Sequence, residues 1–196
     1  MANYLLHESA GFNASPRTAV VGLGNPLHGD DAVGLLVAQS VFEILRHKLT
    51  IDLLEGAILD ARLAERLIGY QRAVIVDALI DAQAKVGTVS RVELGEHICN
   101  PPMSLHTTGF QNILALAQMV GMAIPADIRI YGIVTRQPRG FSQGLSPELR
   151  SKLPEVARAI AAEELRCARE LHRAESHCAS RTVRAEESAE TVKGPP

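Results

Sequence analysis

The chain has 196 residues, of which 46 % are hydrophobic and 21 % are charged, so it is long enough for one globular domain and too apolar to be a disordered chain. A net charge of −2 without a basic stripe argues against nucleic acid as a partner. No apolar run approaches the roughly 18–20 residues that cross a bilayer, so we expect no membrane partner.

Apolar patterns along the chain predict alternating strands and helices. Short apolar runs predict strands over 18–24, 50–56, 72–79, 87–94 and 126–134. Apolar residues at helical spacing predict helices over about 30–47, 60–69 and 108–122, and a last helix from 147 that restarts at Pro154 and ends at 172–177. With right-handed crossovers, this order predicts an α/β fold, a three-layer α/β/α sandwich around a mostly parallel sheet of about five strands. The alternating polarity of 87–94 favours an edge or antiparallel strand.

Composition also divides the chain into regions. We expect a poorly ordered lead-in over 1–17, which lacks the basic and apolar stretches of a secretion signal. A single α/β domain is predicted over 18–175. A disordered tail is predicted over 176–196, because its last 18 residues hold only two sizeable apolar side chains, Val183 and Val192.

The cysteines indicate the compartment. The sequence holds three cysteines, an odd number, at Cys99, Cys167 and Cys178. No two of them form a C-x-x-C pair. This argues against a disulfide framework or a zinc ribbon and predicts a cytoplasmic location.

The stretch VVGLGNPLHGDDAVG, residues 20–34, leaves the first predicted strand through a glycine turn. A dinucleotide site needs a third glycine directly before the helix, and the carboxylates of Asp30 and Asp31 would repel a phosphate there. A helix cap explains one of the two aspartates, and we expect Asp30 to cap the helix that follows. By itself, the pair is typical of a structural role.

Three segments bring acids to the carboxyl edge of the predicted sheet, where ligands bind in this architecture. Asp31 follows the first strand, Glu55 ends the second and Asp77 lies near the end of the third. A carboxylate that closes an apolar strand must be hydrogen-bonded, paired or bound to a cation. His106 precedes a predicted helix, where a capping or surface histidine is as good an explanation as a metal ligand. If they converge, Asp31, Asp77 and His106 form a mixed oxygen and nitrogen metal site with open positions.

Five segments in order carry a resemblance to a known family: VVGLGNPLHGDDAVG, LLEGAILD, VIVDAL, SLHTTGF and YGIVTRQPRGFSQGLSPEL. The first is close to the pattern G-x-G-N-x-x-x-x-D-D/E-x-x-G. Together they resemble the hydrogenase maturation proteases, the endopeptidases that trim the C-terminus of the large subunit of NiFe hydrogenases. The similarity runs from residue 19 to about 170.

The resemblance implies a cytoplasmic, monomeric endopeptidase with an α/β/α fold. It implies that Asp31, Asp77 and His106 contact nickel already bound to the hydrogenase precursor, so the substrate supplies the metal. Cleavage is then expected just after the cysteine motif that holds the Ni–Fe centre, and only on loaded precursor. Glu55 is expected to support the site through hydrogen bonding or proton transfer. The sequence from Glu55 to Ile58, EGAI, departs from the common Asp-Gly-Gly-Thr and bears on specificity.

Three alternatives stay open from the sequence. Cys99 and His106 form a conceivable nucleophile and base, although Cys99 has no clear orienting partner. VGLGNP also opens the peptidyl-tRNA hydrolases, whose later histidine segment this chain lacks. A nickel-binding accessory protein that docks on the precursor without cutting it is the non-enzymatic alternative, and the EGAI sequence is the feature that favours it.

Overall fold

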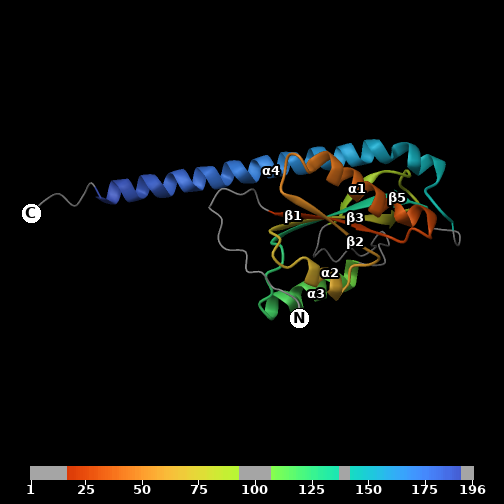
Figure 1. Cartoon of the computed structure of the whole chain (residues 1–196), viewed down its shortest axis with the longest axis horizontal. Coiled ribbons are helices and arrows are strands. Elements are labelled where there is room, and N and C mark those ends of the chain that lie inside the picture. The colour runs from red at the N-terminus through yellow and green to blue at the C-terminus, as the bar shows by residue number, and fades with distance from the viewer. Residues whose placement is uncertain (1–16, 93–106, 137–141, 191–196) are drawn as a thin grey trace, which may run out of the picture.

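The computed structural model of the chain describes residues 17–92, 107–136 and 142–190 (Figure 1). The strands are β1 (Thr18–Leu23), β2 (Ile51–Gly56), β3 (Arg72–Ile80), β4 (Val89–Val92) and β5 (Asp127–Thr135). The helices are the short 3-10 helix η1 (Gly29–Ala32), α1 (Val33–Leu45), α2 (Ala61–Arg66), α3 (Thr107–Met119) and α4 (Pro147–Glu190). The predicted order of strands and helices is confirmed.

One sheet joins the five strands in the order β2-β1-β3-β5-β4. β1 pairs in parallel with β2 and β3, and β3 pairs in parallel with β5. β4 closes one edge and runs antiparallel to β5. This arrangement confirms the predicted mostly parallel sheet and the predicted antiparallel edge strand.

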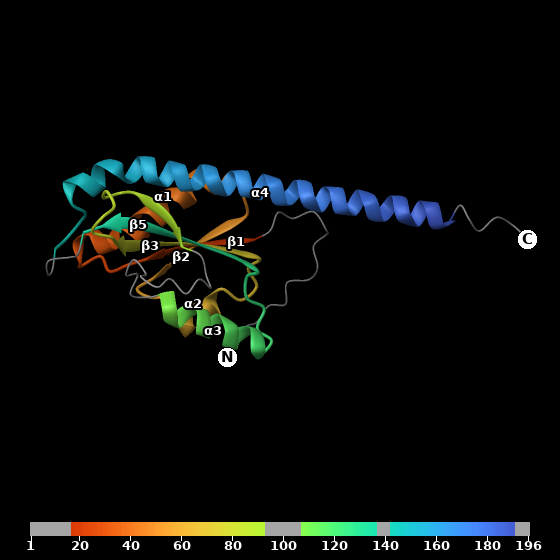
Figure 2. The same cartoon turned by 180° about the vertical axis from the view of Figure 1, so that it is seen from behind.

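Helices cover both faces of the sheet, which confirms the three-layer architecture. α1 and α4 lie on one face and α2 and α3 on the other (Figure 1 and Figure 2). Alternate residues of β3 serve the two layers: Val74 and Val76 join the apolar cluster beneath α1 and α4, whereas Ala73 and Ile75 join the cluster beneath α2 and α3. A near-continuous apolar strand is what a sheet covered on both faces requires.

Helix α4 differs from the prediction in two ways. It continues through Pro154 without a restart, and it runs to Glu190 instead of ending at 172–177. The predicted disordered tail over 176–196 is therefore wrong for 176–190. The physical reason is that Ala, Glu and Arg extend an existing helix at little cost, even without apolar surface to bury. α4 extends well beyond the sheet (Figure 2).

Two further predictions concern the ends of the chain and the lack of a membrane-crossing segment. Residues 1–16 and 191–196 lie outside the described residues, so the predicted lead-in and the limits of the predicted domain stay predictions. Among the helices of the described ranges, none combines the length and the apolar character that a bilayer crossing needs.

A buried charged network attaches α4 to the amino ends of two strands. Glu164 of α4 is 1 % exposed, and its carboxylate accepts hydrogen bonds from Arg72 Nη2 at 2.7 Å and from the Tyr131 hydroxyl. Arg72 also donates from Nε to Asp127 at 3.0 Å. Burial, together with the bond to Glu164, raises the pKa of Tyr131, so its hydroxyl stays protonated and donating.

We expect Glu164→Gln to lower the free energy of unfolding by about 2 kcal/mol, because Nη2 of the buried Arg72 loses its charged acceptor and, among the described residues, only Asp127 remains as a charged partner. Urea unfolding of the variant and the wild type measures the change. Glu163→Gln is the matched control, because that carboxylate pairs with Arg166, whose side chain is 59 % exposed. Such exposed pairs contribute about 0–1 kcal/mol. Equal losses of unfolding free energy in the two variants would contradict a stabilising role of the buried network.

Candidate active site

Glycines bring the start of α1 directly onto the ends of β1 and β3. A Cβ on Gly34 would lie 2.3 Å from the carbonyl oxygen of Leu23 and 2.5 Å from that of Val76. Gly24 has φ +137°, and a Cβ there would lie 2.0 Å from the carbonyl oxygen of Asp31. Only residues without a side chain allow this approach. The glycines of the motif therefore serve helix–strand packing and place Asp31 above the sheet edge.

The side chain of Asp31 is held by the turn that precedes it. Its Oδ2 accepts a hydrogen bond from the backbone N–H of Asn25 at 2.8 Å. The Asn25 side chain in turn accepts from the N–H of Leu27 at 3.0 Å, which closes a local Asx-type turn. The Oδ1 atom of Asp31 accepts no hydrogen bond from the residues that the structure describes.

Asp30 does not cap its own helix, so that prediction is wrong. Neither η1 nor α1 has a side-chain cap. Asp30 Oδ1 instead accepts from the backbone N–H of Ser146 at 2.6 Å, one residue before α4. Ser142 reinforces this contact, because its carbonyl accepts from Gly29 N at 2.7 Å and its N–H donates to Leu27 O at 3.1 Å. The turn is too tight for a cap, and a segment distant in sequence takes the carboxylate.

Asp77 lies within β3, which continues beyond it to Ile80. It is 4 % exposed, and its Oδ1 accepts the N–H of Ala78 at 2.8 Å. In the pairing of β1 with β3, Gly22 lies opposite Val76, so Asp77 follows at the level where β1 is ending. A buried carboxylate is thus placed at the carboxyl edge of the sheet.

Asp31 and Asp77 flank the point where the sheet changes its winding. The connection from β1 leads to β2 on one side, whereas β3 lies on the other side of β1. The crevice outside such a switch point is where open α/β sheets bind ligands. The start of α1 also contacts β3 next to the carboxylate, since a Cβ on Gly34 would lie 3.0 Å from the Cα of Asp77. The structure therefore brings the two segments that carry Asp31 and Asp77 together.

His106 and Cys99 lie outside the described residues. His106 directly precedes α3, which runs opposite to the strands and begins on the side where the parallel strands end (Figure 2). Within ranges 17–92, 107–136 and 142–190, no three His, Cys, Asp or Glu side chains are grouped to hold a metal. The set of Asp31, Asp77 and His106 stays a prediction, of which Asp31 and Asp77 lie within the described residues and His106 does not.

Glu55 is the last residue but one of β2 and is exposed. Its Oε1 accepts from Gln39 Nε2 of α1 at 2.8 Å, and its backbone carbonyl accepts from Arg66 Nη1 of α2 at 2.6 Å. Sequence reasoning missed Gln39 and Arg66, because neither lies in a motif and no spacing marks them. Gln39 holds the carboxylate of Glu55 near α1, and Arg66 holds the backbone of Glu55.

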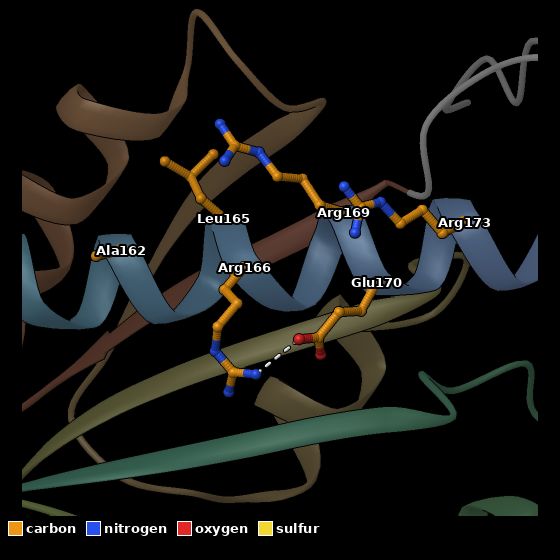
Figure 3. A pocket seen from close by; sticks show the side chains of 6 residues that line it. All are labelled: Ala162, Leu165, Arg166, Arg169, Glu170 and Arg173. Carbon is orange, nitrogen blue, oxygen red and sulfur yellow. Dashed lines mark hydrogen bonds and ion pairs between the residues drawn. The ribbon is translucent and has the colours of Figure 1, made fainter.

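A separate pocket lies on α4, lined by Ala162, Leu165, Arg166, Arg169, Glu170 and Arg173 (Figure 3). Arg166 turns toward Glu170 and pairs with it at 2.7 Å, and Arg169 points the opposite way. At about 1.5 Å per residue, Ala162 is roughly 24 Å along α4 from Ser146, which contacts Asp30. This pocket therefore lies along the middle of α4 and takes no part in the candidate site.

The comparisons with known proteins decide the family. The family model described as hydrogenase maturation protease matches residues 36–163. The chain belongs to the hydrogenase maturation protease family. The matched range includes Asp77, His106 and Glu55 and begins just after the motif that holds Asp31. The predicted family and the predicted enzyme class are confirmed.

Individual members of the hydrogenase maturation protease family are similar over most of the chain. The hydrogenase expression/formation protein HupD of Thiocapsa roseopersicina is 29 % identical over 143 residues, which are 71 % of this chain and 64 % of that relative. HupD of Rhizobium leguminosarum bv. viciae is 30 % identical over 71 % of this chain and 70 % of its own length. The solved structure of the NiFe hydrogenase maturation protease HybD from Thermococcus kodakarensis matches with a TM-score of 0.57 and 28 % identity, over 76 % of this chain and 98 % of that one.

Proposed function

We propose that this protein is the endopeptidase that removes a C-terminal peptide from the nickel-loaded precursor of a NiFe hydrogenase large subunit. The observation that carries the proposal is the packing of the Asp31 turn against the strand of Asp77 at the switch point of the sheet. The names of the related HupD proteins and of the HybD structure, which refer to hydrogenase formation and maturation, support the choice of substrate.

In this proposal the nickel ion is part of the substrate. Asp31 offers Oδ1, and Asp77 offers a carboxylate that is buried and fixed by Ala78 N. With the imidazole of His106, the donor set is two oxygens and one nitrogen, which suits nickel. Precursor without nickel would bring no cation to the two carboxylates. The negative charge of the two carboxylates thus favours binding of the nickel-loaded precursor over the nickel-free form.

Peptide hydrolysis needs water to add to the scissile carbonyl carbon, the C–N bond to break and a proton to reach the departing amine. A nickel ion held by Asp31, Asp77 and His106 would polarise that carbonyl or activate the water. Glu55 is our choice for moving the proton, because Gln39 holds only one of its carboxylate oxygens in the described structure. We also propose that the protein acts as a cytoplasmic monomer, and the odd number of cysteines without a C-x-x-C pair in the sequence supports the reducing compartment.

The test is the mass of the large subunit after incubation with the purified protein. We expect loss of a C-terminal peptide from nickel-loaded precursor and no loss from nickel-free precursor. His106→Ala is expected to leave both precursors intact, because the site loses its nitrogen ligand. Equal cutting of the two precursor forms would overturn recognition through nickel, and unchanged cutting by the variant would remove His106 from the site.

One observation favours a second candidate function. Ala57 and Ile58 are exposed in the loop after β2, in the EGAI sequence that departs from the common family pattern. A protein that docks on nickel-loaded precursor through this loop without cutting it would act as an accessory of maturation. The same mass measurement separates the two: a stable complex with an unchanged subunit mass selects the accessory.

A further inference from the structure

Helix α3 carries an exposed apolar face at its C-terminal end. Of the large hydrophobic side chains that are exposed in the described residues, three lie at this end: Leu116 at 61 % and Met119 at 84 % within α3, and Val120 at 65 % directly after it, where its N–H still donates to the Leu116 carbonyl at 3.1 Å. The opposite side of α3 is buried, with Leu114 at 7 % and Ala117 at 5 % exposure. Residues three and four apart share a helix face, so the three exposed side chains form one continuous surface. We call it the α3 face.

The described chain begins close to this surface. The backbone N–H of Arg17 donates to Gln71 Oε1 at 2.6 Å, and its side chain stacks on the ring of Tyr70 at 4.7 Å. Tyr70 packs against the apolar cluster beneath α2 and α3. Next to it, the N–H of Gly69 donates to Ala123 O at 2.9 Å, three residues past Val120. Arg17, the first described residue, therefore lies at the end of α3 that carries the α3 face.

The segment before Arg17 has suitable side chains within reach. Its sequence from residue 4 to residue 12 is YLLHESAGF, with apolar side chains at Tyr4, Leu5, Leu6 and Phe12. An extended chain covers about 3.3–3.6 Å per residue, so Leu6 can lie up to roughly 36–40 Å from Arg17. The route from Arg17 through Gln71 and Ala123 to Val120 is shorter than this reach.

We propose that residues 4–12 pack across the α3 face and cover Leu116 and Met119. This inference goes beyond the proposed function and does not depend on it. Burial of apolar surface supplies the driving force, and it offsets the entropy lost when the segment is ordered. The short tie from Arg17 to Gln71 lowers that entropy, because it holds the segment near its binding face.

A double-mutant cycle in the full-length chain tests the contact. Leu116→Gln with Met119→Gln removes the apolar face while keeping good helix formers, and Leu5→Gln with Leu6→Gln removes the matching side chains. We expect each pair to lower Tm by about 4 °C or more. The four substitutions together are expected to lower Tm no further than either pair, because both pairs remove the same contact.

Leu36→Gln is the matched control, since Leu36 of α1 is 37 % exposed and lies on the other layer. The change in Tm caused by Leu36→Gln is expected to add to the change caused by the Leu5 and Leu6 substitutions. Hydrogen exchange gives a second measurement: loss of Leu5 and Leu6 should speed exchange of the amides of residues 112–119 and leave α1 unchanged.

Three results would overturn the proposal. Additive losses of Tm for the two pairs show that they do not touch. An unchanged Tm after the Leu5 and Leu6 substitutions shows that the segment covers nothing. A coupling that grows with protein concentration identifies a second copy of the chain as the occupant.

Discussion

Asp77→Asn is expected to reduce cleavage of the nickel-loaded precursor by at least about a hundredfold, while the protein stays folded. Asparagine has nearly the shape of aspartate, and its carbonyl oxygen still accepts the N–H of Ala78, which lies 2.8 Å from Oδ1. The substitution replaces one carboxylate oxygen by the NH2 of a side-chain amide, which donates hydrogen bonds and does not bind a cation. A hundredfold loss corresponds to about 2.7 kcal/mol of the activation barrier. The rate of peptide release, followed by mass, measures it.

Asp60→Asn is the matched control for this prediction. Asp60 lies in the loop after β2, and its Oδ1 accepts from Leu63 N at 3.0 Å at the start of α2. Asparagine caps helices as well as aspartate, so stability and cleavage should stay near those of the wild type. A wild-type rate for Asp77→Asn would remove Asp77 from the site. A comparable loss in both variants would point to a general effect of charge.

Gly34→Ala is expected to lower the free energy of unfolding by about 3 kcal/mol or more and to abolish cleavage. Alanine is the better helix former by roughly 1 kcal/mol, which favours the variant. The new methyl group, however, would stand 2.3 Å and 2.5 Å from the carbonyl oxygens of Leu23 and Val76. Both oxygens belong to strand backbone in the middle of the sheet and have nowhere to move. The free energy cost of this steric clash therefore exceeds the gain in helix propensity, and the start of α1 must move away from β3.

Gly56→Ala separates this effect from glycine replacement in general. The nearest atom to a Cβ at Gly56 is the side chain of Leu23 at 3.4 Å, an ordinary contact, and no carbonyl oxygen lies closer than 3.7 Å. The free energy of unfolding of the Gly56→Ala variant should differ from that of the wild type by less than about 1 kcal/mol. Urea unfolding of both variants gives the comparison. A loss as large in Gly56→Ala as in Gly34→Ala would contradict the role given to the close helix–strand contact.

Much of the fold follows from patterns that act over a few residues. The apolar run of β3 predicts a strand covered on both faces, and 87–94 predicts an edge strand, because pleat and burial leave a direct mark on sequence. The position of Asp77 near the end of an apolar run similarly predicts a carboxylate at the ligand edge. Asp31 is predicted because the glycine turn and the aspartates are adjacent in the chain.

The sequence does not reveal contacts between distant segments. Asp30 is satisfied by the N–H of Ser146, and nothing near either residue specifies the other. The same holds for Gln39 and Arg66, which hold Glu55 from two different helices. The length of α4 is hidden for another reason: low apolar content predicts disorder, whereas helix propensity alone extends a helix that is already nucleated.

The bond between Asp30 and Ser146 has a consequence for synthesis of the protein. The two residues are 116 positions apart, and the turn that holds Asp31 also relies on Ser142. A growing chain that has not yet released Ser146 from the ribosome exposes the glycine turn without its partner. Contacts of such separation form late, because a long loop must close first. The candidate site is therefore completed only after the chain as far as Ser146 has left the ribosome, and a shorter chain would not hold the Asp31 turn in its final form.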